Sequence, residues 1–251
     1  MTRHRNISRP CLRRATGALA VALAATAAGG ALAAAAGAGA GVMRVPASQA
    51  LVSLQNDHAV RSAPSMSARL LETVSAKRPL TGVQTVLPVI GRQRDSAGKP
   101  WVRVRLPGRP LGHSGWIAAA NTRRDTTEWY ILIRLAARQV VVYRDGLVQR
   151  RFSAVVGKPA TPTPRGRFFV EEAVALAGAD AGAPFALASS ARSQVLQLFE
   201  GGPGQIALHG TGNLSAPLGT AASHGCVRIS PRAISWLASR IGGGVPMTIV
   251  S

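Results

Sequence analysis

From about residue 56 onward, the chain is a series of short apolar runs separated by Pro and Gly. Apolar runs of about four to eight residues between turn-forming residues are typical of strands, because helices need longer periodic segments. The run Trp101–Leu106 alternates Val or Leu with Arg, which is the pattern of a half-buried strand. With 251 residues, 47% of them hydrophobic, the chain has enough apolar material for a core. We therefore predict a mainly β fold.

One short helix is predicted near the C-terminus. Pro231 suits the first turn of a helix, because its missing N–H has no helical partner there. Apolar residues follow at helical spacing, and three glycines at 242–244 end the pattern. The apolar positions are Ile234, Leu237, Ala238 and Ile241. Residues 245–250 are expected to form a terminal strand.

The first 43 residues differ in kind from the rest. Five Arg precede Ala15–Met43, a stretch of 29 residues without charge. A basic start, an apolar segment and small-residue sites indicate a secretory signal peptide, and the length also permits an uncleaved membrane anchor. In both cases the rest of the chain is sent outward. We expect an exported protein of the cell wall, the periplasm or the outer face of the cytoplasmic membrane, with membrane contact only through this segment.

The remaining chain divides into three parts. Residues 44–121 show short strands with close turns and are expected to form a small all-β module. Residues 122–128 are polar and charged, and we predict a linker there. A second β-rich domain follows over 129–251, with a hairpin signal at Asp145-Gly146.

The net charge of +20 favours anionic partners such as cell-surface polymers. Aromatic residues make up only 4% of the chain, which argues against a stacking platform for single-stranded nucleic acid. The Arg residues are also dispersed along the chain, so we expect no nucleic-acid partner. The oligomeric state stays open.

The chemistry-bearing residues lie between 209 and 228. Cys11 leaves with a cleaved signal, so Cys226 is the one remaining cysteine, and His209 and His224 are close to it in sequence. A cysteine nucleophile needs a base, because an unperturbed thiol titrates above neutrality. His209 would approach Cys226 from a neighbouring strand, so we prefer it as the base. The amides of Gly225 and Cys226 are the natural oxyanion donors.

No acidic residue follows Glu200, so a local Cys-His-Asp triad is excluded. The base must be oriented by a backbone carbonyl, by a hydroxyl of Ser223 or Thr211, or by an acid from far upstream. Two other interpretations are a buried structural cysteine and a zinc site built from the two His and the Cys. The ligand set is thin for zinc, and we expect neither a metal nor a cofactor.

The segment from His209 to Cys226 resembles the signature of the L,D-transpeptidase family. The signature is a His, a spacer of about fifteen residues and Ser/Thr-His-Gly-Cys, followed by a hydrophobic residue and Arg or Asn, here Val227 and Arg228. Thr163–Phe168 and Gly182–Leu187 are similar to two further family segments, and the resemblance covers about 129–250. It implies a β-sandwich-like catalytic domain. Residues 45–121 resemble bacterial SH3-like modules.

The resemblance also implies an activity. Cys226 would attack the carbonyl before the terminal D-Ala of a peptidoglycan tetrapeptide stem, release D-Ala and form a thioester. An acceptor amine would resolve the thioester as a 3→3 cross-link, with His209 as base and then acid. Arg228 would bind a substrate carboxylate or brace the loop in an ion pair. The residues expected to shape the site or its oxyanion hole are Ser223, His224, Gly225, Gly210 and Thr211.

Three other functions stay open at this point. Water could replace the acceptor amine, which would make the protein an L,D-carboxypeptidase. A protein amine could be the acceptor, which would attach that protein to the wall. The chain could also be a wall-binding protein without catalysis, although a pure binder needs neither His209 nor Cys226.

Overall fold

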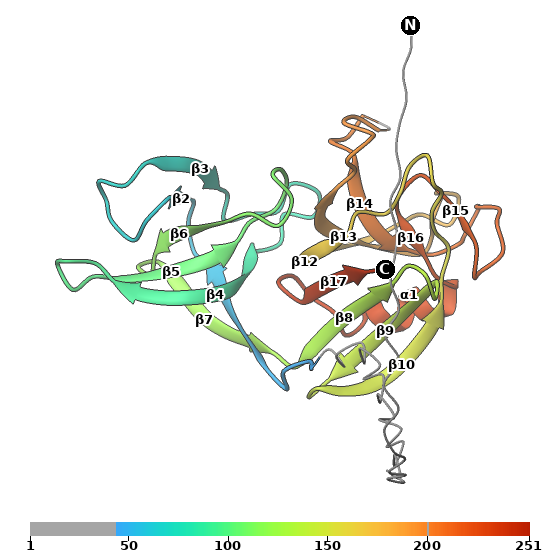
Figure 1. Ribbon diagram of the computed structural model, residues 1–251, viewed down its shortest axis with the longest axis horizontal. Coiled ribbons are helices and arrows are strands. Elements are labelled where there is room, and N and C mark those ends of the chain that lie inside the picture. The colour runs from blue at the N-terminus through green and yellow to red at the C-terminus, as the bar shows by residue number, and fades with distance from the viewer. Residues whose placement is uncertain (1–43, 200) are drawn as a thin grey trace, which may run out of the picture. The chain divides into compact units, whose positions relative to one another are not determined.

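The structure of the protein is a computed structural model that describes residues 44–199 and 201–251. The predicted signal or anchor and Cys11 lie outside these residues. In the described part, strands dominate and one helix is present, α1 (Pro231–Ala238) (Figure 1). This confirms the prediction of a mainly β chain with a short C-terminal helix. Among these residues, no helix is long and apolar enough to span a membrane.

The first sheet contains seven strands, and all of its pairings are antiparallel. Val52, Leu54, Leu87 and Ile117 are fully buried in its core. In spatial order the strands are β3 (Leu70–Val74), β2 (His58–Arg61), β6 (Ser114–Ala118), β5 (Pro100–Arg105), β4 (Val86–Arg94), β1 (Gln49–Leu54) and β7 (Thr122–Thr127) (Figure 1).

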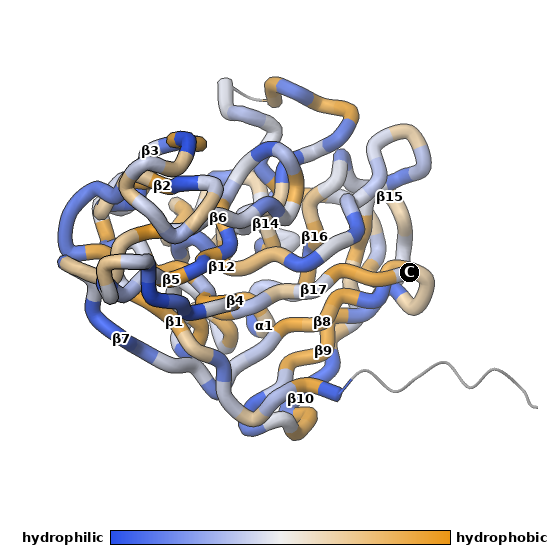
Figure 2. The backbone as a smooth tube through the Cα atoms, turned by 60° about the vertical axis from the view of Figure 1, so that its left-hand side comes forward, coloured by the Kyte–Doolittle hydropathy of each residue, from blue (hydrophilic) through white to orange (hydrophobic). Residues whose placement is uncertain are grey.

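Strand β7 lies where we expected a linker. It pairs with β1 along its whole length, from Gln49 opposite Thr127 to Leu54 opposite Thr122. Figure 2 shows β7 as a hydrophilic segment, and its four central residues are exposed. β7 is therefore an edge strand held by backbone hydrogen bonds. It carries no apolar alternation, which is the sequence signal that would have predicted it.

The second sheet contains eight strands. β17 runs parallel to β8, and β14 runs parallel to β16, while the other pairs are antiparallel. In spatial order the strands are β10 (Leu147–Ser153), β9 (Gln139–Arg144), β8 (Trp129–Arg134), β17 (Pro246–Val250), β12 (Gly166–Ala175), β13 (Phe185–Arg192), β14 (Gln205–His209) and β16 (Val227–Arg228). Two short strands, β11 (Val156–Gly157) and β15 (Ala221–Ser223), form a separate parallel pair.

Strands β8, β9 and β17 of this sheet are rich in hydrophobic residues, as their colours in Figure 2 show. On β8, Ile131 and Ile133 enter one core cluster, and Leu132 between them enters another. Successive side chains of a strand point to opposite faces, so a sheet covered on both sides needs a continuous apolar run.

Strand β12 serves the cores of both sheets. Phe168 packs in the core of the second sheet, and its neighbour Phe169 packs in the core of the first. Both rings are almost completely buried. Burying a Phe side chain contributes about 1.5–3 kcal/mol. The two adjacent rings therefore join the two sheets through one strand.

Helix α1 begins as the sequence predicts. The hydroxyl of Ser230 accepts a hydrogen bond from the amide of Ala233 at 3.2 Å, and Pro231 occupies the first turn. Ala233, Ile234 and Leu237 are buried. This face packs in the core of the second sheet, where the helix contacts β13 and β14.

Candidate active site

The pairing of β14 with β16 brings the predicted base and nucleophile to one region. His209 ends β14 and lies opposite Arg228 in the parallel register, while Cys226 immediately precedes β16. The spacer between the two strands is long enough for the crossover that a parallel pair requires. Strand pairing therefore brings His209 and Cys226, which are apart in the sequence, to the same region of the fold.

A pocket of about 900 Å³ opens at this point. Four of the predicted site residues line it: His209, His224, Cys226 and Arg228. The other four, Gly210, Thr211, Ser223 and Gly225, do not line it. Further lining residues that the sequence reasoning did not single out include Gln205, Phe199, Leu80, Leu176, Leu196 and Leu214.

His209 is oriented by a backbone carbonyl, one of the three options that the sequence left open. Its Nδ1 atom lies 2.8 Å from the carbonyl oxygen of Gly210. A carbonyl only accepts, so Nδ1 carries the proton and Nε2 keeps its lone pair. Burial lowers the pKa of His209 below 6.5; the Gly210 carbonyl opposes that shift, and the charge of Arg228 adds to it. The imidazole is therefore neutral and basic near pH 7.

Gly182 lies directly behind the imidazole ring. A Cβ atom at this position would lie 2.4 Å from His209 Nδ1, and the backbone has a φ of +92°. The carbonyl of Gly182 also accepts a hydrogen bond from the amide of Gly210 at 2.8 Å. Only glycine allows the 182–184 segment to support the His209 ring this closely.

The thiol of Cys226 lies against β14. Its Sγ atom is 3.4 Å from the amide nitrogen of Ala207 and 3.9 Å from the carbonyl oxygen of Gln205. The side chain is only partly buried, so a ligand in the pocket can reach it.

Ser223 holds the turn before Cys226 in shape. Its hydroxyl donates to the carbonyl of Cys226 at 2.5 Å and accepts from the amide of Gly225 at 3.1 Å. The side chain is completely buried. This corrects one expectation, because the Gly225 amide points to Ser223 and is not presented to the pocket. The conformation of Gly225, with φ of +121°, turns that amide inward.

Two threonines brace the same turn from the Pro-rich loop before β12. Thr161 Oγ1 donates to the carbonyl of Ser223 at 3.2 Å, and Thr163 Oγ1 donates to the carbonyl of Gly225 at 2.8 Å. Thr163 Oγ1 also accepts from the amide of Gly157 at 2.9 Å. Sequence reasoning quoted Thr163 only as part of a motif. Its spacing to Cys226 carried no signal of this contact.

His224 is exposed at the pocket and has two neighbours. Its ring stacks on Phe199 with centroids 5.7 Å apart, and its Nε2 atom lies 3.3 Å from Lys158 Nζ. A charged Lys only donates, so His224 accepts through Nε2 in this arrangement. The Nε2 lone pair of His224 is therefore engaged with Lys158.

Arg228 does not brace the loop through an ion pair in the described part of the chain. Its Nη1 atom donates to the carbonyl of Ser215 at 3.3 Å. Its Nε atom is buried and has no hydrogen-bond partner among the described residues. The guanidinium lines the pocket and keeps donor capacity for a carboxylate.

Comparison with known proteins finds similarity in the part of the chain that contains this site. A sequence model of the L,D-transpeptidase catalytic domain family, YkuD, matches residues 128–249. The YkuD protein of Bacillus licheniformis is 29% identical over 125 residues, which cover 50% of this chain and 67% of that protein.

Solved structures show more distant similarity. An L,D-transpeptidase from Mycobacterium smegmatis is 20% identical with a TM-score of 0.36, covering 61% of this chain and 92% of its own. L,D-transpeptidase 3 from Mycobacterium tuberculosis, in complex with a faropenem-derived adduct, is 13% identical with a TM-score of 0.41, covering 66% and 91%. The family match includes all eight predicted site residues, from His209 to Arg228, but not the lining residue Leu80. Residues 128–249 therefore match the L,D-transpeptidase catalytic domain family, YkuD.

Proposed function

We propose that the protein is a peptidoglycan L,D-transpeptidase that forms 3→3 cross-links through a thioester on Cys226. The family acts on peptidoglycan stem peptides and belongs to the acyltransferases. The observation that carries the proposal is the His209–Gly210 hydrogen bond, which leaves Nε2 of His209 as a base in the same pocket as the thiol.

Acylation begins with proton transfer from the Cys226 thiol to His209 Nε2. The thiolate attacks the carbonyl between the third residue of the stem and D-Ala, and the carbonyl π electrons move to oxygen. When the tetrahedral intermediate collapses, the C–N bond to D-Ala breaks. The imidazolium of His209 gives its proton to the leaving nitrogen, and the thioester remains.

In deacylation, His209 acts as a base toward the acceptor amine. The side-chain amine of an acceptor stem attacks the thioester, and neutral His209 takes one of its protons. The C–S bond breaks, the sulfur is reprotonated, and a new amide joins the two stems. Arg228 binds a carboxylate of the stem through its unpaired donors and fixes the orientation of the peptide.

The oxyanion of each intermediate needs N–H donors. The Gly225 amide is engaged by Ser223, so the Cys226 amide is the donor that we assign to this role. Ser223, Thr161 and Thr163 position it by fixing the carbonyls of the same turn. Gly210 contributes through its carbonyl, which orients His209, and we assign Thr211 no direct contact with substrate.

We also propose how the protein reaches the cell wall and binds there. Export would be directed by residues 1–43, as a cleaved signal or as an anchor, and would place the enzyme at the wall. The first sheet would act as an SH3-like module. The net charge of +20 would favour approach to anionic wall polymers.

Analysis of the reaction products distinguishes the proposed function from the three alternative functions. The purified protein is incubated with a tetrapeptide muropeptide, and the products are separated and weighed by mass spectrometry. A dimer with loss of D-Ala supports the transpeptidase. Tripeptide alone identifies an L,D-carboxypeptidase, and a dimer that appears only with an added protein amine identifies protein attachment. No product from folded, wall-bound protein identifies a non-catalytic binder.

A further inference from the structure

A loop of the first sheet reaches the active-site pocket of the second. The loop connects β3 to β4, and its residue Leu80 is one of the lining residues of the pocket. The side chain of Leu80 is 63% exposed, although it is a large apolar group. An exposed leucine at the wall of a pocket offers apolar surface that a ligand can bury.

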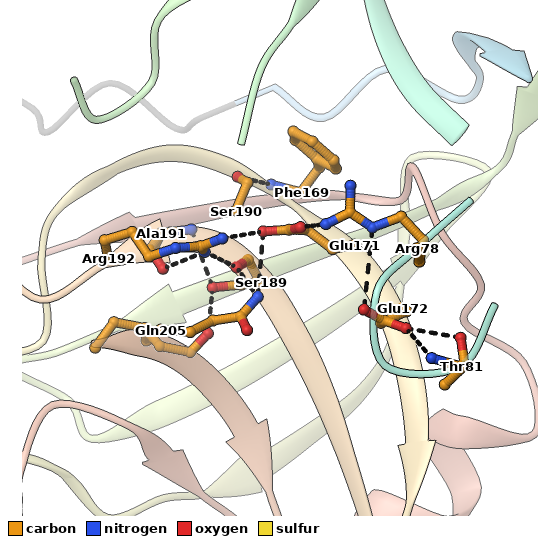
Figure 3. Close-up of polar contacts among 11 residues, drawn as sticks. Arg78, Thr81, Phe169, Glu171, Glu172, Ser189, Ser190, Ala191, Arg192 and Gln205 are labelled. Atoms are coloured by element: carbon orange, nitrogen blue, oxygen red, sulfur yellow. Dashed lines mark hydrogen bonds and ion pairs between the residues drawn. The ribbon is translucent and has the colours of Figure 1, made fainter. Parts of the chain in front are cut away.

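Two neighbours of Leu80 fix the loop to strand β12. Arg78 forms an ion pair with Glu171, and Thr81 donates two hydrogen bonds to Glu172 Oε2, from its amide at 2.9 Å and its hydroxyl at 2.7 Å. Figure 3 shows Arg78 and Thr81 on the loop and both carboxylates on β12. The contacts flank Leu80 in sequence, so they hold the loop on both sides of it.

Both carboxylates are buried, each with about 1% of its surface exposed. A buried carboxylate is costly unless it is paired and hydrogen-bonded, so these contacts restrict the loop to one position. The ladder between β12 and β13 has a register shift between Val170 and Glu172, which leaves Glu171 as the extra residue. This irregularity allows two adjacent Glu side chains to meet the same loop.

Further hydrogen bonds connect the contact between Arg78 and Glu171 to the pocket. Glu171 Oε1 also accepts from Arg192 at 2.9 Å and from Gln205 Nε2 at 3.2 Å (Figure 3). Gln205 begins β14, lines the pocket, and its carbonyl oxygen faces Cys226 Sγ. Arg78 is therefore linked through one carboxylate to the strand that carries His209.

We propose that the β3–β4 loop is a specificity-determining wall of the active site. Leu80 contacts an apolar part of the donor stem peptide, and Arg78 and Thr81 are positioning residues that hold it there. The first sheet is then part of the substrate site, besides any role in wall adhesion. The identity of the ligand as a stem peptide rests on the proposed function.

The first test replaces Leu80 by Ser and uses Val83→Ser as the matched control. Val83 is an exposed apolar residue of the same loop, at 48%, but it does not line the pocket. Loss of an apolar contact of this size changes the discrimination between substrates by about tenfold or more. We expect KM for the tetrapeptide donor to rise about tenfold in Leu80→Ser, with little change in kcat, and to stay constant in Val83→Ser. Equal KM values in the two variants would overturn the proposal.

The second test concerns the positioning residues. Thr81→Val removes the hydroxyl that binds Glu172, and Thr81→Ser restores it. We expect Thr81→Val to raise KM as Leu80→Ser does, and Thr81→Ser to return it to the wild-type value. A purely structural role would lower Tm in Thr81→Val and leave KM unchanged, and that result would contradict the assignment. Arg78→Met is compared with Arg78→Lys in the same way where both proteins fold.

A substrate-independent readout separates failure of this proposal from failure of the proposed function. Cys226 is alkylated with N-benzylmaleimide, which is apolar, and with iodoacetamide, which is small and polar. Leu80→Ser should slow the first reaction several-fold relative to the second. If the wild type forms no thioester but this selectivity is found, the proposed reaction is contradicted and the proposed role of the β3–β4 loop is supported. If the thioester forms but Leu80→Ser changes neither the selectivity nor KM, the proposed role of the β3–β4 loop is contradicted.

Discussion

The Nδ1 atom of His209 lies 2.8 Å from the carbonyl oxygen of its own neighbour, Gly210. This contact replaces the carboxylate that usually orients a catalytic His. It fixes the tautomer without adding a negative charge, so nothing nearby stabilises the imidazolium strongly. Burial and the positive charge of Arg228 disfavour the imidazolium further. The site is therefore arranged around a neutral base.

The neutral base predicts a specific pH dependence. Because the pKa of His209 is lowered, the imidazole stays deprotonated at pH 6.5 and loses its basicity only below that value. The acid limb of kcat/KM for thioester formation is expected below pH 6.5. Stopped-flow acylation between pH 4.5 and 8 measures it. An acid limb above pH 6.5 would mean that His209 is held as an imidazolium, contrary to this account.

Arg228 contributes to that shift, so its removal should move the limb. In Arg228→Met the repulsion between the guanidinium and the imidazolium is lost, and the pKa of His209 rises. We expect the acid limb to move to higher pH and KM to rise because a carboxylate contact is lost. Arg228→Lys keeps the charge and should keep the limb while still raising KM. A limb that stays in place in Arg228→Met would show that the charge does not act on His209.

Gly182 predicts a positional effect. In Gly182→Ala the new methyl group meets His209 Nδ1, and the left-handed backbone conformation is strained. A displacement of about 1 Å in a catalytic group can cost about 100-fold in rate, so we expect kcat to fall by ten- to 100-fold. Gly178→Ala is the matched control, because a Cβ there has open space and φ is ordinary. Equal activity of the two variants would show that the Gly182 contact is unimportant.

Thr163 tests the bracing of the nucleophile turn. Thr163→Val keeps the shape but leaves the Gly225 carbonyl and the Gly157 amide without their partner. Leaving a buried polar group unsatisfied costs about 1–3 kcal/mol of unfolding free energy. Thr163→Ser retains both hydrogen bonds and should lose less. Chemical denaturation gives the stability, and acylation rates report whether the turn moves; wild-type values for Thr163→Val in both would refute the role.

Several features of the fold and site could be predicted from the sequence because they have local signals. Short apolar runs between Pro and Gly predicted strands, and the spacing after Pro231 predicted α1. Strand β7 had no such signal, since its residues are polar and backbone pairing with β1 alone makes it a strand.

The site shows the same division. The location of His209 and Cys226 in one region could be predicted from a motif, but the partner of the Gly225 amide could not. That amide is turned by a positive φ and taken by Ser223, and both depend on the folded turn. The acids Glu171 and Glu172 gave no signal either, because their partners Arg78 and Thr81 lie about 90 residues earlier in the chain.

The most direct test of the central claim is intact-mass spectrometry of the protein during incubation with a tetrapeptide muropeptide. The claim predicts an adduct equal to the stem without D-Ala on the wild type and none on Cys226→Ala. Because His209 is the proposed base, His209→Gln should form the adduct more slowly by about 100-fold or more. An adduct that persists in Cys226→Ala, or a wild-type protein that stays unmodified while folded, would contradict the claim.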